Sequence, residues 1–474
     1  MPRIICGIVG CVALLSITSD IRAADAPVRP NIIYVMTDDL GYGDIGCFGQ
    51  QRIRTPHIDR LAAEGMKLTS YYAGCTVCRP SRLVLWTGKH TGHTAISSNA
   101  QYRFKPSDVT VAELLKEAGY ATGGVGKWAM GGVGTTGHPN QNGFDFWMGY
   151  LNQSNAHNYY PTFLWENDQQ VTLPGNVIGN EPAGRGRVAS KRVSYSHDFM
   201  TNAALNFIHR KKDNPFLLHI HLTIPHANNE GGRVNGDGME VPEYGIYANK
   251  DWPAPEKGFA AMITRMDADV GRLMKLLKEL GIDEKTLVVF TSDNGPHNEG
   301  GHKHEFFNSN GDLKGFKRSM HEGGYRVPMI ARWPGSIEPA RVSSHPSAFQ
   351  DFLPTACALA GAKTPSGIDG ISYLPTLLGN TDKQAKHDYL YCASLEGATS
   401  VGVRFGKWKL VLYRSPRPGR SKKTAATSDD SGNRKPDWRL YDLSNDIGEE
   451  TNVASQHPRV VAEILALLKR DGLQ

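Results

Sequence analysis

The sequence lacks the features of a membrane-spanning, nucleic-acid-binding or repeat protein. Its one long apolar run, residues 4–17, is too short to cross a bilayer as a helix. No block of Lys and Arg is dense enough to form a nucleic-acid-binding stripe, although 53 basic residues against 47 acidic ones give a net charge of +6. Internal repeats of solenoid length are also absent. These absences exclude those three classes and leave a soluble protein for which an anionic substrate is compatible.

The first residues have the order of an export signal. Arg3 precedes the apolar run of residues 4–17, and small residues follow at Ala23, Ala24 and Ala26. We expect residues 1–24 to be a cleaved signal peptide and the protein to be exported, to a bacterial periplasm or out of the cell. Cys11 lies inside the apolar run and not at its end, which argues against a lipid anchor.

Cysteine is scarce, with seven residues in 474. Cys6 and Cys11 would leave with the signal peptide, so five remain. An odd number in an exported protein means that at least one thiol is unpaired or chemically altered. Cys75 and Cys78 form a single C-x-x-C pair, which without a second pair is a weak indication of zinc or redox chemistry.

The length favours one large domain followed by a smaller one. Strand patterns alternate with helix patterns over most of the chain, which predicts an α/β fold with a large, mixed, mainly parallel sheet sandwiched by helices. The expected strands are 31–37, 66–72, 120–126, 216–224 and 286–291, and the expected helices are 55–64, 110–118 and 259–280.

After about residue 390 the pattern changes to short strands. They are expected at 401–405, 407–413 and 438–443, before a terminal helix at 458–470. We expect a large domain over residues 25–385 and a smaller C-terminal α+β subdomain with an antiparallel sheet over residues 386–474. Residues 415–437 are rich in Pro, Gly, Ser, Lys and Asp and are expected to form a loop.

Polar oxygen-bearing residues follow two of the predicted buried strands. Asp38 and Asp39 come after strand 31–37, and Asp293 and Asn294 come after strand 286–291. The carboxyl ends of parallel strands meet at one edge of a sheet, where ligands gather. Such side chains suit a hard divalent cation such as Ca²⁺ or Mg²⁺, although an Asp pair at a strand end can also cap a helix.

Cys78 opens the segment Cys78-Arg79-Pro80-Ser81-Arg82. A cysteine just before a proline-initiated turn lies at a helix N-terminus, where backbone N–H groups favour anionic groups. The guanidinium of Arg82, one turn later, can lie beside Cys78 at the same helix N-terminus. The alternative is an ordinary helix start with a buried, inert cysteine.

The C-x-P-S-R motif, at this distance from an Asp-Asp pair, resembles the type I sulfatases, the formylglycine-dependent, arylsulfatase-like family of the alkaline phosphatase superfamily. The similarity extends over nearly the whole chain, and its motifs stand in the family's order. They are Asp38–Asp44, Cys78–Arg82, Thr87–His93, Gly126–Trp128, Pro225-His226, Asp293–Gly295, Lys317 with His321–Gly324, and Leu440–Leu443. The resemblance implies an alkaline phosphatase-like fold and hydrolysis of sulfate monoesters, on a sulfated saccharide or an aryl sulfate.

In this family the motif cysteine is converted after synthesis to Cα-formylglycine (3-oxoalanine), whose hydrate supplies the nucleophile. The resemblance therefore implies that Cys78 is converted and that a formylglycine-generating or anaerobic sulfatase-maturating enzyme is a partner. It also implies one Ca²⁺ held by Asp38, Asp39, Asp293 and Asn294 together with the formylglycine oxygen. A plain thiolate at Cys78 is the competing chemistry.

The resemblance also assigns the charged residues around the sulfate group. Arg82, Lys127 and Lys317 would stabilise the charge that builds on its oxygens. Lys317 is preferred to Lys314 because its distance to Glu322-Gly323-Gly324 matches the family. His226, after a buried strand and a proline, would protonate the leaving oxygen.

One position departs from the family pattern. The family commonly reads Gly-Lys-Trp-His-Leu-Gly, and this chain has Ala129 in place of the histidine. Alanine cannot accept a proton. Because the family's histidine assists the release of sulfate, its replacement affects that step of the reaction and not metal binding or sulfate recognition. Two alternatives stay open: a phosphate or phosphonate monoesterase of the same superfamily, and a sulfated-glycan-binding protein of low turnover. His157, His302 and His304 are further candidates for lining the substrate cleft.

Overall fold

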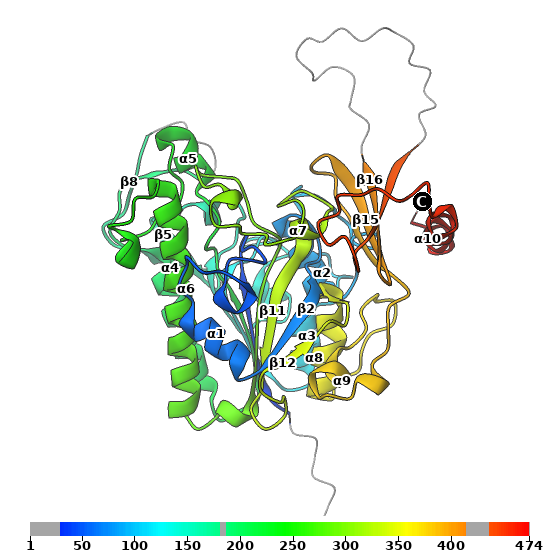
Figure 1. The fold of residues 1–474 in the computed structure, drawn as a ribbon. Coiled ribbons are helices and arrows are strands. Elements are labelled where there is room, and N and C mark those ends of the chain that lie inside the picture. The colour runs from blue at the N-terminus through cyan, green and yellow to red at the C-terminus, as the bar shows by residue number, and fades with distance from the viewer. Residues whose placement is uncertain (1–28, 181–185, 414–435, 474) are drawn as a thin grey trace, which may run out of the picture.

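The computed structural model describes residues 29–180, 186–413 and 436–473. The expected signal peptide, residues 1–24, and nearly all of the loop expected at 415–437 lie outside the described residues. An 11-stranded sheet forms the centre of the molecule (Figure 1). In spatial order its strands are β12 (Arg341–Ser343), β2 (Met66–Tyr72), β11 (Arg326–Arg332), β10 (Thr286–Ser292), β1 (Asn31–Thr37), β9 (Phe216–His221), β3 (Ala121–Lys127), β4 (Phe146–Tyr150), β5 (Phe163–Glu166) and β6 (Gln169–Thr172), with β13 (Ser347–Ala348) beside β2.

The middle of this sheet is parallel. β10, β1, β9, β3 and β4 pair in parallel, whereas β11 and β5 join on either side as antiparallel neighbours. In the register, Thr37 stands opposite Ser292 and Met36 opposite His221. The residues that follow β1, β9 and β10 therefore leave the sheet at the same edge. The expected mixed, mainly parallel sheet is confirmed.

Helices cover both faces of the sheet (Figure 1). One face carries α1 (Pro56–Ala63), α4 (Ser196–Lys211) and α6 (Ala254–Glu279), and the other carries α2 (Cys78–Thr87), α3 (Val111–Glu117) and α8 (Phe352–Ala360). β1 explains the two layers: Ile33 and Val35 face one core, and Ile32 and Tyr34 face the other. A strand buried on both faces needs this unbroken apolar run.

A second, antiparallel sheet follows in the C-terminal part. It consists of β14 (Leu390–Ala393), β15 (Thr399–Phe405), β16 (Trp408–Tyr413) and β17 (Asp437–Asp442) in chain order, covered by α10 (Pro458–Arg470). Ile464 and Leu468 of α10 pack onto Val403 and Leu410. The boundary expected between residues 385 and 386 stays a prediction.

The remaining described elements are short. They are α5 (Asn229–Asn235), α7 (Glu322–Tyr325), α9 (Leu374–Leu377), the pair β7 (Val177–Ile178) and β8 (Ala189–Lys191), and several 3₁₀ turns, of which Asn155–His157 is used below. Among the helices of the described ranges, none is both long and apolar enough to cross a membrane.

Candidate active site

Four oxygen-bearing side chains meet where β1 and β10 end. The backbone N–H of Asp39 donates to Asp293 Oδ1 at 3.2 Å, and Asn294 Nδ2 donates to Asp39 Oδ1 at 2.7 Å. Asp38 completes the group, and each of the four residues is at most 1% exposed. The cause is the parallel register, which brings the residues after Thr37 beside those after Ser292.

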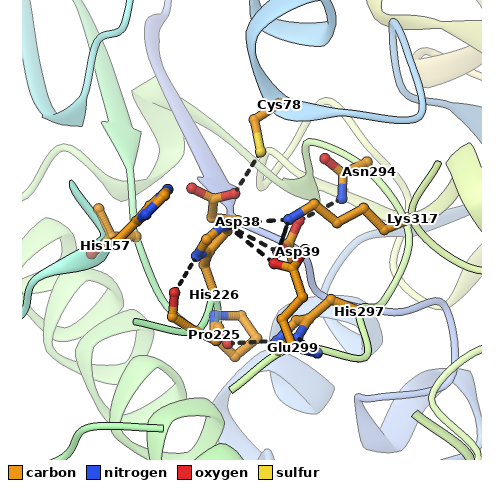
Figure 2. Close-up of polar contacts among 12 residues, drawn as sticks. Asp38, Asp39, Cys78, His157, Pro225, His226, Asn294, His297, Glu299 and Lys317 are labelled. Atoms are coloured by element: carbon orange, nitrogen blue, oxygen red, sulfur yellow. Dashed lines mark hydrogen bonds and ion pairs between the residues drawn. The ribbon is translucent and has the colours of Figure 1, made fainter. Parts of the chain in front are cut away.

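Cys78 is the first residue of α2 and faces this cluster (Figure 2). Its Sγ donates to Asp38 Oδ1 at 3.3 Å. The Ser81 hydroxyl donates to the backbone carbonyl of Asp293 at 2.6 Å and so ties the helix start to the end of β10. Burial and the nearby Asp38 carboxylate raise the pKa of the Cys78 thiol well above its ordinary value. An unmodified thiol in this position therefore stays protonated and is a poor nucleophile.

Three buried cations pair with the three carboxylates of the cluster. Lys127 Nζ lies 2.6 Å from Asp38 Oδ2, and Lys317 Nζ lies 2.7 Å from Asp39 Oδ2. Arg82, one turn into α2, reaches Asp293 Oδ2 at 2.8 Å. These positive charges are held in place by buried partners and not by solvent. A charge-stabilising site needs such fixed charges around a developing anion.

The cluster fits a hard divalent cation. Among the described residues, Asn294 Oδ1 is buried and has no hydrogen-bond partner. Burial and the neighbouring Asp38 carboxylate raise the pKa of Asp293 to about 7. An unpaired buried oxygen is costly, and carboxylates that converge in a dry site need a counter-charge. The donors are oxygens, as Ca²⁺ prefers, and the ligand atoms of Asp38, Asp39 and Cys78 lie within 4.8 Å of one another.

His226 follows β9 at the same edge. Its Nδ1 lies 2.7 Å from the carbonyl oxygen of Ala227, so Nδ1 carries the proton, because a carbonyl only accepts. Nε2 then accepts from Lys317 Nζ at 3.2 Å. Burial and the Lys317 charge lower the pKa of His226 to about 3. Nε2 also lies 3.5 Å from Asp39 Oδ2, and the ring lines the cavity above the cluster, so the role of His226 as the leaving-group acid stays a prediction.

A cavity of about 640 Å³ opens above these residues. Cys78, Ala129, His157, His226 and Lys317 line it. A second cavity of ≈ 650 Å³ adjoins it and shares wall residues, which are Leu151, Asn152, Asn155, Phe163 and Trp165. The reactive groups thus lie at the floor of a cleft long enough to hold more than the ester group.

The structure brings together all nine side chains that the sequence predicts for the site; their roles stay predictions. They are Asp38, Asp39, Cys78, Arg82, Lys127, His226, Asp293, Asn294 and Lys317. His302 and His304 are not among the residues that line the two cavities. His302 lies instead against Phe259 and pairs with Glu256 at 2.6 Å.

Two acidic residues were missed by sequence reasoning. Glu299 Oε2 lies 3.0 Å from Lys317 Nζ, and Glu230 Oε2 lies 3.0 Å from His157 Nδ1. Both stand in loop or short-helix segments where single acids are common, so no spacing rule singles them out. Glu299 adds a fourth carboxylate to the cluster, and Arg318 lies 2.7 Å from its Oε1.

Sequence comparisons agree with this geometry. The model of the sulfatase family matches residues 30–362, and that of the N-sulphoglucosamine sulphohydrolase C-terminal region matches residues 312–418. Human arylsulfatase A is 32% identical over 473 residues, covering 93% of this chain and 86% of that protein. The N-acetylgalactosamine-6-O-sulfatase of Bacteroides thetaiotaomicron is 30% identical, covering 93% of each chain.

Solved structures share the fold. Ps i-CgsB in complex with k-i-k-neocarrahexaose superposes with a TM-score of 0.74 at 26% identity, covering 93% of this chain and 92% of that chain. A Bacteroides thetaiotaomicron protein described with the metabolism of multiple glycosaminoglycans has a TM-score of 0.73 at 28% identity, covering 94% of this chain and 100% of the other. The chain belongs to the sulfatase family, and it is a type I sulfatase of the alkaline phosphatase superfamily, a sulfuric ester hydrolase.

Proposed function

We propose that this sulfatase hydrolyses a sulfate monoester on a saccharide, using formylglycine formed from Cys78 and one bound Ca²⁺. The observation that carries the proposal is the position of Cys78. It lies at the floor of an open cavity, 3.3 Å from a carboxylate of an oxygen-rich cluster that buried cations surround. The raised pKa of the unmodified thiol argues against the plain thiolate as nucleophile.

In this proposal Asp38, Asp39, Asp293 and Asn294 hold the cation. Ca²⁺ would supply positive charge next to the sulfate oxygens, and a hydroxyl of the hydrated formylglycine would supply the nucleophile toward sulfur. Arg82 and Lys127 hold fixed charge beneath the sulfate group, and Lys317 holds it at the side of His226. Because these side chains are already paired and buried, little reorganisation is needed when the substrate binds.

A saccharide fits the cleft better than an isolated aryl group. Phe163 and Trp165 form part of the wall shared by the two cavities, and flat aromatic side chains are suited to the apolar face of a sugar ring. Two proteins similar to this chain are named for saccharides. One is the N-acetylgalactosamine-6-O-sulfatase, and the other is Ps i-CgsB, whose structure is a complex with k-i-k-neocarrahexaose. We infer that at least one further sugar residue occupies the second cavity.

We further infer that the protein is exported and that a formylglycine-generating or anaerobic sulfatase-maturating enzyme modifies it. Residues 1–24 support export through their basic, apolar and small-residue order. The odd number of cysteines beyond that segment is in keeping with a chemically altered cysteine.

The test starts with the mass of the Cys78-containing peptide from protein made in its native host. An aldehyde or its hydrate is expected, together with release of free sulfate from a panel of sulfated mono- and oligosaccharides. Cys78→Ala should abolish sulfate release and leave the melting temperature of the protein nearly unchanged. An unmodified thiol, or faster cleavage of phosphate than of sulfate esters, would overturn the proposal.

A binding protein of low turnover is the second candidate, and Ala129 is the observation that favours it. Ala129 lines the cavity and offers no proton-accepting atom. Saturable binding of a sulfated saccharide without release of sulfate, by protein that carries the aldehyde, would favour this candidate over the enzyme.

A further inference from the structure

The wall of the Cys78 cavity carries positive charge that no acidic residue of the wall offsets. Among the described residues that line this cavity, none is acidic, and the cationic ones are Arg79, Arg103, Lys317 and Arg318. Glu299, behind the wall, pairs with two of them. Its Oε2 lies 3.0 Å from Lys317 Nζ, and its Oε1 lies 2.7 Å from Arg318. Arg79 and Arg103 have no carboxylate partner in the described part of the chain.

Arg79 is buried, and uncharged groups hold it in place. The residue is 8% exposed. Its Nε donates to the backbone carbonyl of Ala129 at 3.1 Å, and its Nη1 donates to that of Asn99 at 2.7 Å and also to that of Ala100. Its Nη2 has no hydrogen-bond partner among the described residues, so this donor is free for a ligand. A buried charge that lacks a counter-charge is costly.

The place of Arg79 in α2 adds to this cost. It is the second residue of the helix, and the partial positive charge of the helix N-terminus disfavours a cation there and favours an anion. The first turn of α2 holds no acidic residue that would balance the guanidinium. A buried cation that lines a cavity, stands at a helix N-terminus and has no acidic partner is the arrangement that a bound anion completes.

Arg79 differs from the cations that surround the reacting sulfate group. In the proposed function that group lies between Arg82, Lys127 and Lys317, and each of these three is paired with a carboxylate of the oxygen-rich cluster. No hydrogen bond of Arg79 reaches that cluster in the described residues. Its partners are in the segments of Asn99 and Ala129, and both of these residues line the cavity. The charge of Arg79 is therefore available to another part of the substrate.

We propose that Arg79 binds a second anionic group of the saccharide, a sulfate or a carboxylate near the sulfate ester that is cleaved, and so selects substrates with at least two anionic groups. This inference rests on the proposed function and names its substrate class. A guanidinium suits the task because it is always charged and its planar N–H donors match the oxygens of a sulfate or a carboxylate. Arg103, exposed on the same wall, adds charge that attracts such a substrate to the cavity.

The first test uses the wild-type protein that carries the aldehyde. It measures kcat and KM for a saccharide monosulfate, for the same saccharide with a second sulfate, and for a monosulfate linked to a uronate. We expect KM for at least one of the two doubly anionic substrates to be about 10-fold or more below that for the monosulfate, because a charge-assisted hydrogen bond is added. Added salt should reduce the difference. The two doubly anionic substrates distinguish a sulfate from a carboxylate as the second group, and an equal KM for all three substrates would overturn the proposal.

The second test removes the charge. Arg79→Gln should raise KM for the preferred doubly anionic substrate by about 10-fold or more and leave both constants for the monosulfate nearly unchanged. Arg79→Lys keeps the charge without the planar donors and should give an intermediate KM. Arg54→Gln, at an exposed arginine outside the cavity, is the matched control and should change neither constant. Because Arg79 is next to Cys78, the mass of the Cys78-containing peptide is measured in each variant to confirm that the aldehyde is present.

Equal losses for every ester in Arg79→Gln, or a lower kcat with KM unchanged, would overturn the proposal and mark Arg79 as a residue of the reacting sulfate site or of the fold. If Arg79→Gln does not fold, the KM ratio of the wild type decides. If the wild type releases no sulfate from any ester, the proposed function itself fails, which is a separate outcome. Calorimetric titration with the same three saccharides then decides the role of Arg79, and equal affinities for singly and doubly anionic saccharides would overturn it.

Discussion

At the scale of single residues, the position and the charge of each reactive side chain in the site depend on a buried partner. Lys127 is held by Asp38, and Lys317 is shared between Asp39 and Glu299. Two opposing effects act on the pKa of Asp38. Burial opposes its ionisation, but Lys127 and the other cations hold its pKa well below the usual range. Removing one member of such a pair leaves the other as an uncompensated buried charge.

The first prediction concerns Lys127. Lys127→Met should lower the free energy of unfolding by about 3 kcal/mol, because the Asp38 carboxylate loses its closest cation. Activity should also fall by about 10²-fold, because one of the charges beneath the sulfate group is lost. Urea unfolding and sulfate release measure the two effects. Lys105→Met, at an exposed position, is the control, and an equal effect there would contradict the argument.

The second prediction concerns the cation. Adding Ca²⁺ to chelator-treated protein should raise its melting temperature, because a ligand at about 100 times its Kd stabilises the folded state by about 2.7 kcal/mol. Asn294→Ala should reduce this rise, since the unpaired Asn294 Oδ1 is one of the proposed ligands. The measurement is differential scanning fluorimetry with and without Ca²⁺. Asn214→Ala, at an exposed site, should keep the full rise, and its loss there would contradict the assignment.

At the scale of elements, the sequence predicts the bounds of a helix or strand well when interactions between neighbouring residues determine where it begins and ends. The predicted strand 31–37 and helix 458–470 match β1 and α10 to the residue. The helix at 110–118 forms as α3 (Val111–Glu117), with Thr110 and Glu113 in a capping box. Apolar runs and caps act within a few residues, so they can be read from the sequence.

Other elements are not predicted because their stability comes from tertiary packing. α4 (Ser196–Lys211) has no side-chain hydrogen bond at its N-cap, and its buried face includes the polar residues Ser196, His197 and Thr201. The same limit applies in the site. Cys78 and Lys317 are predicted because they stand in motifs. The pairing of His157 with Glu230 depends instead on how a 3₁₀ turn and the start of α5, far apart in the sequence, meet in space.

The third prediction tests a contact between elements. His387 Nε2 lies 2.8 Å from Asp351 Oδ1, and the other carboxylate oxygen of Asp351 accepts the N–H of Ala348 at 2.7 Å at the start of the turn before α8. Burial opposes protonation of His387, but the Asp351 carboxylate raises its pKa above the ordinary value. The pair therefore stabilises the fold fully below about pH 6.5, the unfolded pKa, and its contribution is lost as the pH rises through the folded pKa.

His387→Gln should accordingly cost about 1–2 kcal/mol of unfolding free energy at pH 6 and less at pH 8. Urea unfolding of the variant and the wild type at both pH values measures this. His209→Gln should show no difference between the two pH values. A cost that is equal or larger at pH 8 would mean that the charge on His387 is not what stabilises the contact.

At the scale of the whole molecule, the two sheets share one interior. Lys409 of β16 lies 2.7 Å from Glu322 Oε1 at the start of α7, and both side chains are fully buried. Leu390 and Val411 of the second sheet belong to the same hydrophobic core as Trp86 of α2. The C-terminal sheet therefore supports the helix that begins with Cys78, although the two are more than 300 residues apart in the sequence.

The last prediction follows from this shared core. Thermal unfolding should show one cooperative transition for both sheets, because separating them would expose apolar core and leave Glu322 buried without Lys409. Lys409→Met should lower the midpoint of that single transition and also reduce activity by disturbing α7, whose Gly324 carbonyl accepts the N–H of Gly295 beside Asn294. Lys407→Met, at the exposed end of the same hairpin, should do neither. Calorimetry and sulfate release measure these effects. Two resolved transitions in the wild type would show that residues 386–474 fold independently, and the site would then depend on the large sheet alone.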